Sequence, residues 1–277
     1  MARWSLHPVT PHQAQIMLIP TAFGVNTQAP TAILNAGRDL CGFEPRLNID
    51  VDKLAIGQLE ALDDEPPFAM CEAAVSHHLK RQQWPILLPS QMAATWGAVR
   101  AIWKQEPRLC VVYCSAHANL FPVPEQMLAD EDPHLSSASW VERLYNAQIQ
   151  VVYVGMRSSS ATAWQWLQQH HSPVFWAQQE WQAEDVIAHL PPCPIFLIID
   201  ANVLDPASVA AVAYPEPGGV SWQCLLSTCL ELFRARPVLG VSLGGLSVTN
   251  GIRQSAQPLA RLLNWLMACH AAHPPLS

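Results

Sequence analysis

Short runs of apolar residues alternate along this chain with segments of helical length. The apolar runs predict strands at residues 16–19, 85–88, 109–114, 150–154, 173–176, 195–200 and 237–241, with 48–51 as an edge strand. The segments between them predict helices at residues 30–35, 93–104, 161–169, 182–189, 222–233 and 258–270, and another that ends at residue 80. This alternation predicts βαβ units and therefore an α/β fold with a mostly parallel sheet.

The run from Ile195 to Ile199 is the most informative predicted strand. Consecutive large apolar residues are typical of a strand that is buried on both faces in the middle of a parallel sheet. The run is followed directly by Asp200. A carboxylate is thus predicted at the carboxyl end of the strand, where α/β proteins place their functional groups.

Composition limits the class of protein. Half of the 277 residues are apolar and 13% are charged, and no break in composition divides residues 1–277, so we expect a single domain with a large core. The net charge of −7 predicts no binding to nucleic acid or to an anionic membrane. The sequence has no apolar signal core, no run that spans a bilayer and no CxxC pair among its eight cysteines, so we expect a soluble, cytoplasmic protein with reduced thiols.

Two turns follow the strand at 195–200 in a specific pattern. The chain reads Asp-Ala-Asn-Val-Leu-Asp-Pro from residue 200 to residue 206, and Pro-Glu-Pro-Gly-Gly from residue 215 to residue 219. This pattern resembles the ureohydrolase superfamily (arginase, agmatinase, formiminoglutamase), whose strand ends Asp-x-Asp-x-x-Asp-Pro and continues into a Pro-Glu-Pro-Gly-Gly loop. Residues 154–158, Val-Gly-Met-Arg-Ser, are similar to the family's Ile-Gly-x-Arg-Ser. The resemblance implies an arginase-like three-layer α/β/α sandwich with a mainly parallel, doubly wound sheet.

The resemblance also implies two manganese ions and a set of positions that hold them. Those positions are Gln91, Ser115, His117, Asn119, Asp200 and Asn202 in this sequence. The family's motifs there are Gly-Gly-Asp-His-Ser, Asp-Ala-His-x-Asp and Asp-x-Asp, so only His117 and Asp200 keep the ligating type. Gly245 stands where the family's last strand supplies a glutamate near the substrate's guanidinium.

These substitutions change the chemistry that the positions can perform. Manganese binds mainly to carboxylate oxygens, with imidazole nitrogen as a supplement, and amide or hydroxyl oxygens bind it far more weakly. We therefore expect no manganese pair and no cofactor, with at most one weakly bound divalent metal on His117 and Asp200. Asparagine at 119 and 202 keeps the shape of aspartate and adds amide donors, so we expect hydrogen bonds within the pocket.

Other candidate residues have two interpretations each. His134 lies near the family's proton-shuttling loop histidine, or it is an exposed histidine of the long polar loop at 120–139. Arg157 binds an anionic ligand or, as we expect, braces the neighbouring loop. His117 is a residual metal ligand or a hydrogen-bonded core histidine. The histidine pairs at 77–78 and 170–171 are expected at the surface, because adjacent residues on a helix point apart.

The substitutions predict a catalytically inactive ureohydrolase homologue, a pseudoenzyme that acts by binding a small-molecule ligand or a protein partner. We expect it to assemble with itself or with an active relative, and some of its eleven tryptophans to lie at subunit contacts. The alternative is a metal-dependent C–N hydrolase of a guanidino or amidino compound that uses a single metal. A Ser-His-Asp triad of Ser115, His117 and Asp200 lacks the nucleophile-elbow pattern of serine hydrolases.

Overall fold

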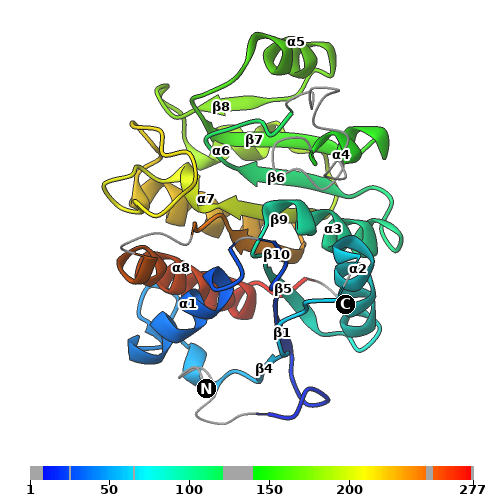
Figure 1. Ribbon diagram of the computed structural model, residues 1–277, viewed down its shortest axis with the longest axis vertical. Coiled ribbons are helices and arrows are strands. Elements are labelled where there is room, and N and C mark those ends of the chain that lie inside the picture. The colour runs from blue at the N-terminus through cyan, green and yellow to red at the C-terminus, as the bar shows by residue number, and fades with distance from the viewer. Residues whose placement is uncertain (1–8, 25, 65, 121–139, 248–251, 276–277) are drawn as a thin grey trace.

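The fold is built around one parallel sheet. The computed structural model describes residues 9–24, 26–64, 66–120, 140–247 and 252–275. Within them the sheet has the strand order β4-β1-β5-β10-β9-β6-β7-β8, and every neighbouring pair is parallel (Figure 1). The strands are β1 Ile16–Pro20, β4 Ile56–Gln58, β5 Trp84–Leu88, β6 Cys110–Cys114, β7 Gln150–Met156, β8 Val174–Trp176, β9 Ile195–Asp200 and β10 Val238–Gly244. The prediction of a mainly parallel sheet is confirmed.

Helices cover both faces of this sheet. One face carries α1 Ala29–Ala36, α6 Ala183–Ala188, α7 Trp222–Ala235 and α8 Ile252–Ala272. The other carries α2 Pro67–Leu79, α3 Thr95–Trp103, α4 Glu142–Asn146 and α5 Ala161–Gln169. In Figure 1, α1, α7 and α8 lie to the left of the sheet, and α2 and α3 lie to its right. The structure is therefore the three-layer α/β/α sandwich that the resemblance implies. No helix in the described parts of the chain is long and apolar enough to cross a bilayer.

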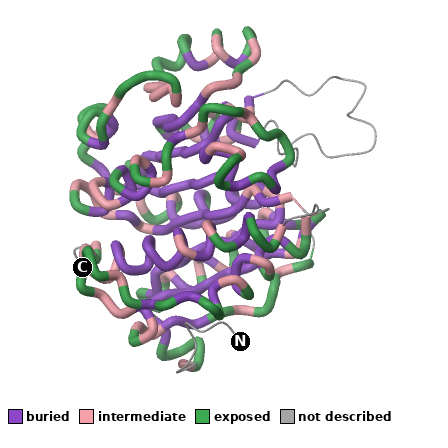
Figure 2. Tube along the Cα trace, turned by 90° about the vertical axis from the view of Figure 1, so that its left-hand side faces the viewer, coloured by how far each residue is buried: buried purple, intermediate pink, exposed green. Residues whose placement is uncertain are grey.

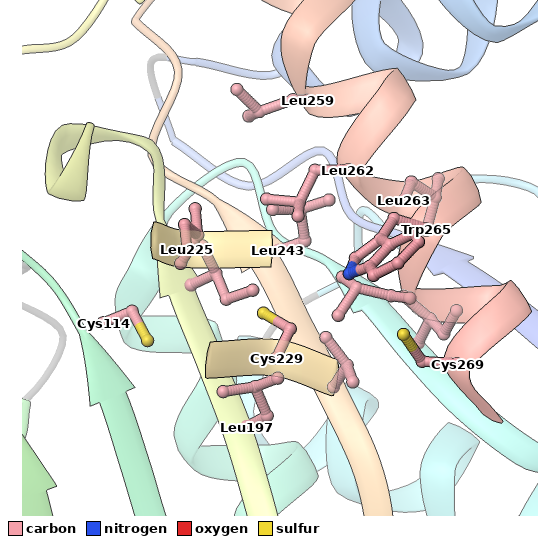
Figure 3. Close-up of a cluster of buried hydrophobic side chains, with 14 of the residues drawn as sticks. Cys114, Leu197, Leu225, Cys229, Leu243, Leu259, Leu262, Leu263, Trp265 and Cys269 are labelled. Carbon is pink, nitrogen blue, oxygen red and sulfur yellow. The ribbon is translucent and has the colours of Figure 1, made fainter. Parts of the chain in front are cut away.

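The central strands are buried on both faces because successive side chains enter different cores. In β9, Leu197 packs in the core beneath α7 and α8, whereas Phe196 and Ile198 pack in the core beneath α2 to α5. Figure 2 shows the resulting continuous band of buried residues through the middle of the molecule. In Figure 3, side chains of α7 and α8, including Leu225 and Trp265, pack over Leu197 and Leu243. The unbroken apolar pattern of residues 195–199 thus has its expected cause.

The predicted edge strand at 48–51 is wrong as an element of the main sheet. Residues Ile49–Asp50 form β3, which pairs antiparallel with β2 Phe43–Glu44 in a separate two-stranded sheet. The carboxylate of Asp50 accepts the N–H of Asp52 at 3.3 Å and turns the chain into a short helical turn. The edge position next to β1 is instead taken by β4, a strand of three residues that carries too short an apolar pattern to be found.

His78 was expected at the surface, and this expectation is wrong. The side chain is 3% exposed, and its Nδ1 makes a 2.7 Å hydrogen bond with Oε1 of Gln83. The amide of Gln83 then donates to the carbonyls of Pro11 and Ala14. His77 is exposed, as neighbours on a helix require. The buried histidine is tolerated because a hydrogen bond satisfies its ring.

His270 is a half-buried histidine in the last turn of α8. Its ring is stacked on Trp84 with centroids 3.9 Å apart, and its Nδ1 has no hydrogen-bond partner among the described residues. Burial lowers the pKa of His270 from 6.5 to about 4, since the charged ring would lose its hydration. The unfolded chain therefore takes up a proton in this pH range while the folded chain does not.

We expect His270 to make folding stability depend on pH. A group with a depressed folded pKa contributes stability that is present above its unfolded pKa and is lost as the pH falls towards its folded pKa, here from 6.5 to about 4. The free energy of unfolding should fall by about 2 kcal/mol from this group between about pH 7 and pH 4.5. The variant His270→Phe keeps a ring against Trp84 but has no group that titrates there. In this variant, the fall in the free energy of unfolding that comes from the histidine should be absent. Urea unfolding of both proteins between about pH 7 and pH 4.5 measures the free energy of unfolding at each pH. If it fell equally in the two proteins, His270 would have an ordinary pKa in the folded state.

Candidate functional site

Polar side chains gather at the carboxyl edge of the sheet. Gln91 follows β5, Gly245 follows β10, Asp200 ends β9 and Ser115 follows β6. These strands are consecutive neighbours in the sheet, and Gly244 is in register with Asp200. Parallel strands place their carboxyl ends on the same side, so these positions share one edge, which is where open α/β sheets bind ligands.

A chain of hydrogen bonds joins the ends of β6 and β9. The Ser115 hydroxyl donates to Oδ1 of Asn202 at 3.1 Å, and the Ala116 N–H donates to the same oxygen at 2.9 Å. The His117 N–H donates back to the Ser115 oxygen at 3.1 Å. Ser115 and Asn202 are both buried. The carboxamide of Asn202 therefore uses its carbonyl oxygen within the protein.

Asp200 is a buried carboxyl group beside this chain of bonds. It is 5% exposed, and its Oδ1 accepts the Asn202 N–H at 3.1 Å. Burial raises the pKa of Asp200 from 3.8 to about 7, and the bond from Asn202 opposes that rise only in part. The described residues provide no salt bridge to it. Burial without a charged partner thus favours the neutral form of this carboxyl group.

Tyr113, on β6, is a further polar residue of the site, and the charge of Asp200 acts on it. Its phenol is fully buried, and burial together with the charge of Asp200 raises its pKa above the ordinary value. The Asn119 amide donates to the Tyr113 hydroxyl, from a backbone with φ of +52°. Sequence reasoning missed Tyr113 because it sits in an apolar run. The alternation along β6 was the available signal, since it places residues 113 and 115 on one face.

His117 and Tyr214 lie at the outer side of the site. The Nε2–H of His117 donates to the Tyr214 carbonyl at 3.3 Å, and the two rings meet edge to face at 6.3 Å. A carbonyl oxygen can only accept, so this contact assigns the proton to Nε2. Tyr214 is 75% exposed, an unusual position for a large aromatic side chain. His134 lies outside the described residues.

Two glycines make room for the polar side chains. Gly245 has φ of +88°, and a Cβ there would overlap Oδ1 of Asp200 and lie 2.8 Å from the Ala201 nitrogen. Gly24 is covered in the same way by the amide of Gln91. The Asp200 carboxyl thus occupies the space that any side chain at 245 would need. Gln91 is positioned against the loop after β1.

Arg157 braces the loops around the site through backbone carbonyls. Its guanidinium donates to the carbonyls of Asn202 and Leu204 at 2.7 and 3.2 Å, and to that of Glu216 at 2.8 Å. Further bonds reach the carbonyls of Gly155 and Val203. The fixed fork of five N–H donors matches such a set of acceptors. The side chain holds the segment after β9 against the Pro-Glu-Pro-Gly-Gly turn.

Comparison with known proteins identifies the family. The model of the arginase family matches residues 24–266. The chain belongs to the arginase family. It is 23% identical over 270 residues to an N(1)-aminopropylagmatine ureohydrolase of Thermus thermophilus, covering 91% of this chain and 88% of that protein. It is 23% identical over 213 residues to the agmatinase of Bacillus subtilis, covering 74% and 71%.

Solved structures of the family share the fold. The agmatine ureohydrolase of Thermoplasma volcanium superposes with a TM-score of 0.81 at 20% identity, covering 95% of this chain and 92% of that one. A Trypanosoma cruzi formiminoglutamase structure with manganese superposes with a TM-score of 0.83 at 17% identity, covering 99% of each chain. Within the described residues of this arginase-family chain, no group of three or more His, Cys, Asp or Glu side chains is placed to hold a metal ion.

We expect the contact between Gly245 and Asp200 to be measurable by substitution. Gly245→Ala should destabilise the fold by about 3 kcal/mol, because it adds a collision with Asp200 to the strain of a positive φ. Gly218→Ala is the matched control, since Gly218 has φ of +74° but no described atom within 4 Å of a Cβ. It should cost about 1 kcal/mol. Chemical denaturation of both variants compares them, and equal losses would mean that Asp200 does not fill this space.

Proposed function

We propose that this protein is a catalytically inactive member of the arginase family, a pseudoenzyme that acts by binding a ligand or a partner. The hydrogen bond from the Ser115 hydroxyl to the Asn202 carboxamide supports this most directly. Both residues stand at positions that the resemblance assigns to metal ligands. Each satisfies its polar group with the other instead of presenting it to an ion.

The donor set does not fit a pair of manganese ions. Two adjacent divalent ions need bridging carboxylates, and the position at 115 offers a hydroxyl that is already bonded. The amide of Asn119 is directed to Tyr113, and the Nε2 of His117 is directed to a carbonyl. Asp200 is the one carboxyl group left among these positions. No step that needs two metal ions is therefore assigned to this site.

The substrate side of the site has changed as well. The resemblance implies a glutamate at position 245 near the guanidinium of the substrate, and this chain has glycine there. The Asp200 carboxyl fills the adjacent space, so that space has no room for a second carboxylate in that role. The loss of metal ligands and of the substrate anchor together favours binding over hydrolysis.

Binding remains chemically reasonable at this edge of the sheet. The exposed Tyr214 ring and the partly exposed His117 offer stacking and hydrogen-bonding surface, next to a buried carboxyl group. We propose that the chain forms a single domain, works in the cytoplasm, and assembles with itself or with an active relative. The tryptophan-rich surface around β8, with Trp164, Trp176 and Trp181 half-buried, fits a subunit contact.

The alternative is a C–N hydrolase with one metal ion on His117 and Asp200. The names of the relatives, agmatinase and N(1)-aminopropylagmatine ureohydrolase, are those of hydrolases. For this chain, such a site would need His117 to leave the Tyr214 carbonyl or to bind through Nδ1. Activity and metal binding distinguish the two functions.

The protein should not hydrolyse arginine, agmatine, guanidinobutyrate or formiminoglutamate, even with excess manganese. The reason is that position 115 lacks the bridging carboxylate and position 245 lacks the glutamate. Urea and formamide release are measured on protein purified without a histidine tag. Manganese-dependent release that His117→Ala abolishes would establish the hydrolase instead.

Folding stability should be indifferent to manganese. A ligand that binds only the folded state, held at about a hundred times its Kd, stabilises by about 2.7 kcal/mol. The unmodified protein should show no such rise in Tm over a chelator control. A large rise would argue for the single-metal site.

Restoring the charges should reverse this behaviour. Ser115→Asp, Asn119→Asp and Asn202→Asp together crowd carboxylates around Asp200, so the metal-free variant should lose stability and regain it with manganese. The matched control places the same charges at exposed positions, as Ser159→Asp, Asn35→Asp and Asn146→Asp. This control should respond to manganese as the parent does. Thermal melts with chelator and with manganese provide the comparison, and a site variant that behaves like the control would refute the retained site geometry.

A further inference from the structure

Two cysteines lie together at the amino edge of the sheet, at the opposite end of β6 and β9 from the candidate site. Cys110 is the first residue of β6, and Cys193 lies in the proline-rich segment just ahead of β9. The strands are parallel neighbours with Cys110 in register with Ile195. The Cys110 N–H donates to the Pro194 carbonyl at 3.1 Å, so the backbones are tied at this point.

The two thiols influence each other electrostatically, since each shifts the pKa of the other. Both side chains belong to the same buried cluster beneath α7 and α8. Both are free cysteines. Cys110 is completely buried, whereas Cys193 is 7% exposed and follows the exposed Pro192. Cys193 is therefore the thiol that lies nearer to the solvent.

Two arginines, Arg236 and Arg108, contribute positive charge at the outer thiol. The guanidinium of Arg236 donates to the carbonyls of Pro191 and Leu190 at 3.0 and 3.4 Å, which fixes it beside this segment. The interaction with the Cys110 thiol lowers the pKa of Cys193 to about 7, with help from the charges of Arg236 and Arg108 and against the effect of burial. The same interaction and burial raise the pKa of Cys110. Such an arrangement pairs a nucleophilic thiolate with a protonated neighbour.

We propose that Cys110 and Cys193 are a redox modification site that closes to a reversible disulfide when the protein meets hydrogen peroxide. The position of the two cysteines at the start of adjacent parallel strands, the backbone bond between their segments and the arginine bound beside them carry this assignment. It does not depend on the proposed function, because neither cysteine belongs to the candidate site.

The chemistry uses peroxide as the oxidant. The Cys193 thiolate attacks one peroxide oxygen, so that an S–O bond forms, the O–O bond breaks and hydroxide leaves as water after taking a proton. The Cys110 sulfur then attacks the sulfenic sulfur, forming the S–S bond and breaking the S–O bond. The hydroxyl leaves with the Cys110 proton as a second water. Two thiols and one peroxide thus give one disulfide and two waters.

A disulfide here would cross-link β6 to the segment ahead of β9 and close the chain from residue 110 to residue 193. Closing a long loop restricts the unfolded chain and stabilises the native state. The protein with the disulfide between residues 110 and 193 should therefore be more stable than the reduced protein. Reduction by dithiothreitol should restore the original state.

The test treats the native full-length protein with a small molar excess of hydrogen peroxide at neutral pH. Free thiols should fall from eight to six per chain, and peptide mapping without reductant should find residues 110 and 193 linked. The Tm should rise by at least about 5 °C. Cys193→Ser and Cys110→Ser should each abolish the linked peptide and the rise, whereas the matched control Cys41→Ser, at an exposed cysteine, should keep both.

Peptide mapping of the peroxide-treated protein without substitutions tests the proposal even if a cysteine variant fails to fold. The proposal is overturned when peroxide oxidises Cys41 or Cys224 while Cys110 and Cys193 remain alkylatable thiols. It is also overturned when the linked peptide forms only in denaturant, or when the linked protein melts at or below the Tm of the reduced one.

Discussion

The contact between the end of β6 and the turn after β9 is the constraint on which the site depends. A buried carboxamide oxygen must be satisfied, and Asn202 achieves this by accepting from Ser115 and from the Ala116 backbone. Those two bonds set the path of the chain to His117, and the Asn202 N–H fixes the Asp200 carboxyl. Each polar group at the edge of the sheet is oriented by the one before it. In such a connected network, removal of one member leaves the others buried without partners.

The surrounding scaffold is independent of this chemistry. Arg157 holds the turn after β9 and the Pro-Glu-Pro-Gly-Gly loop by carbonyl contacts alone, and Asp205 accepts the N–H of Gly218 at 2.8 Å from the other side. Backbone carbonyls are present whatever side chains line the edge of the sheet. The family's geometry can therefore persist while the side chains at its centre change.

Much of the fold could be predicted from the sequence because β9 and its neighbours are buried on both faces, which leaves an unmistakable apolar run. Short elements such as β4 escaped, since three residues carry no period, and His78 was misplaced because its partner Gln83 lies beyond the helix. The candidate positions could be named by resemblance. Their hydrogen-bond partners could not, because the Asn119 contact with Tyr113 and the His117 contact with the Tyr214 carbonyl depend on rotamers and loop paths.

The glycine after β10 has a consequence for the mutational routes open to this chain. Because Asp200 lies in the volume beside Gly245, a glutamate introduced at 245 has no place until the carboxyl of Asp200 turns away. Asp200 in turn is held by Asn202, which is held to Ser115. A carboxylate-rich centre at these positions would therefore require coordinated changes at several of them. A single substitution at position 245 is thus coupled, through Asp200 and Asn202, to the side chain at position 115.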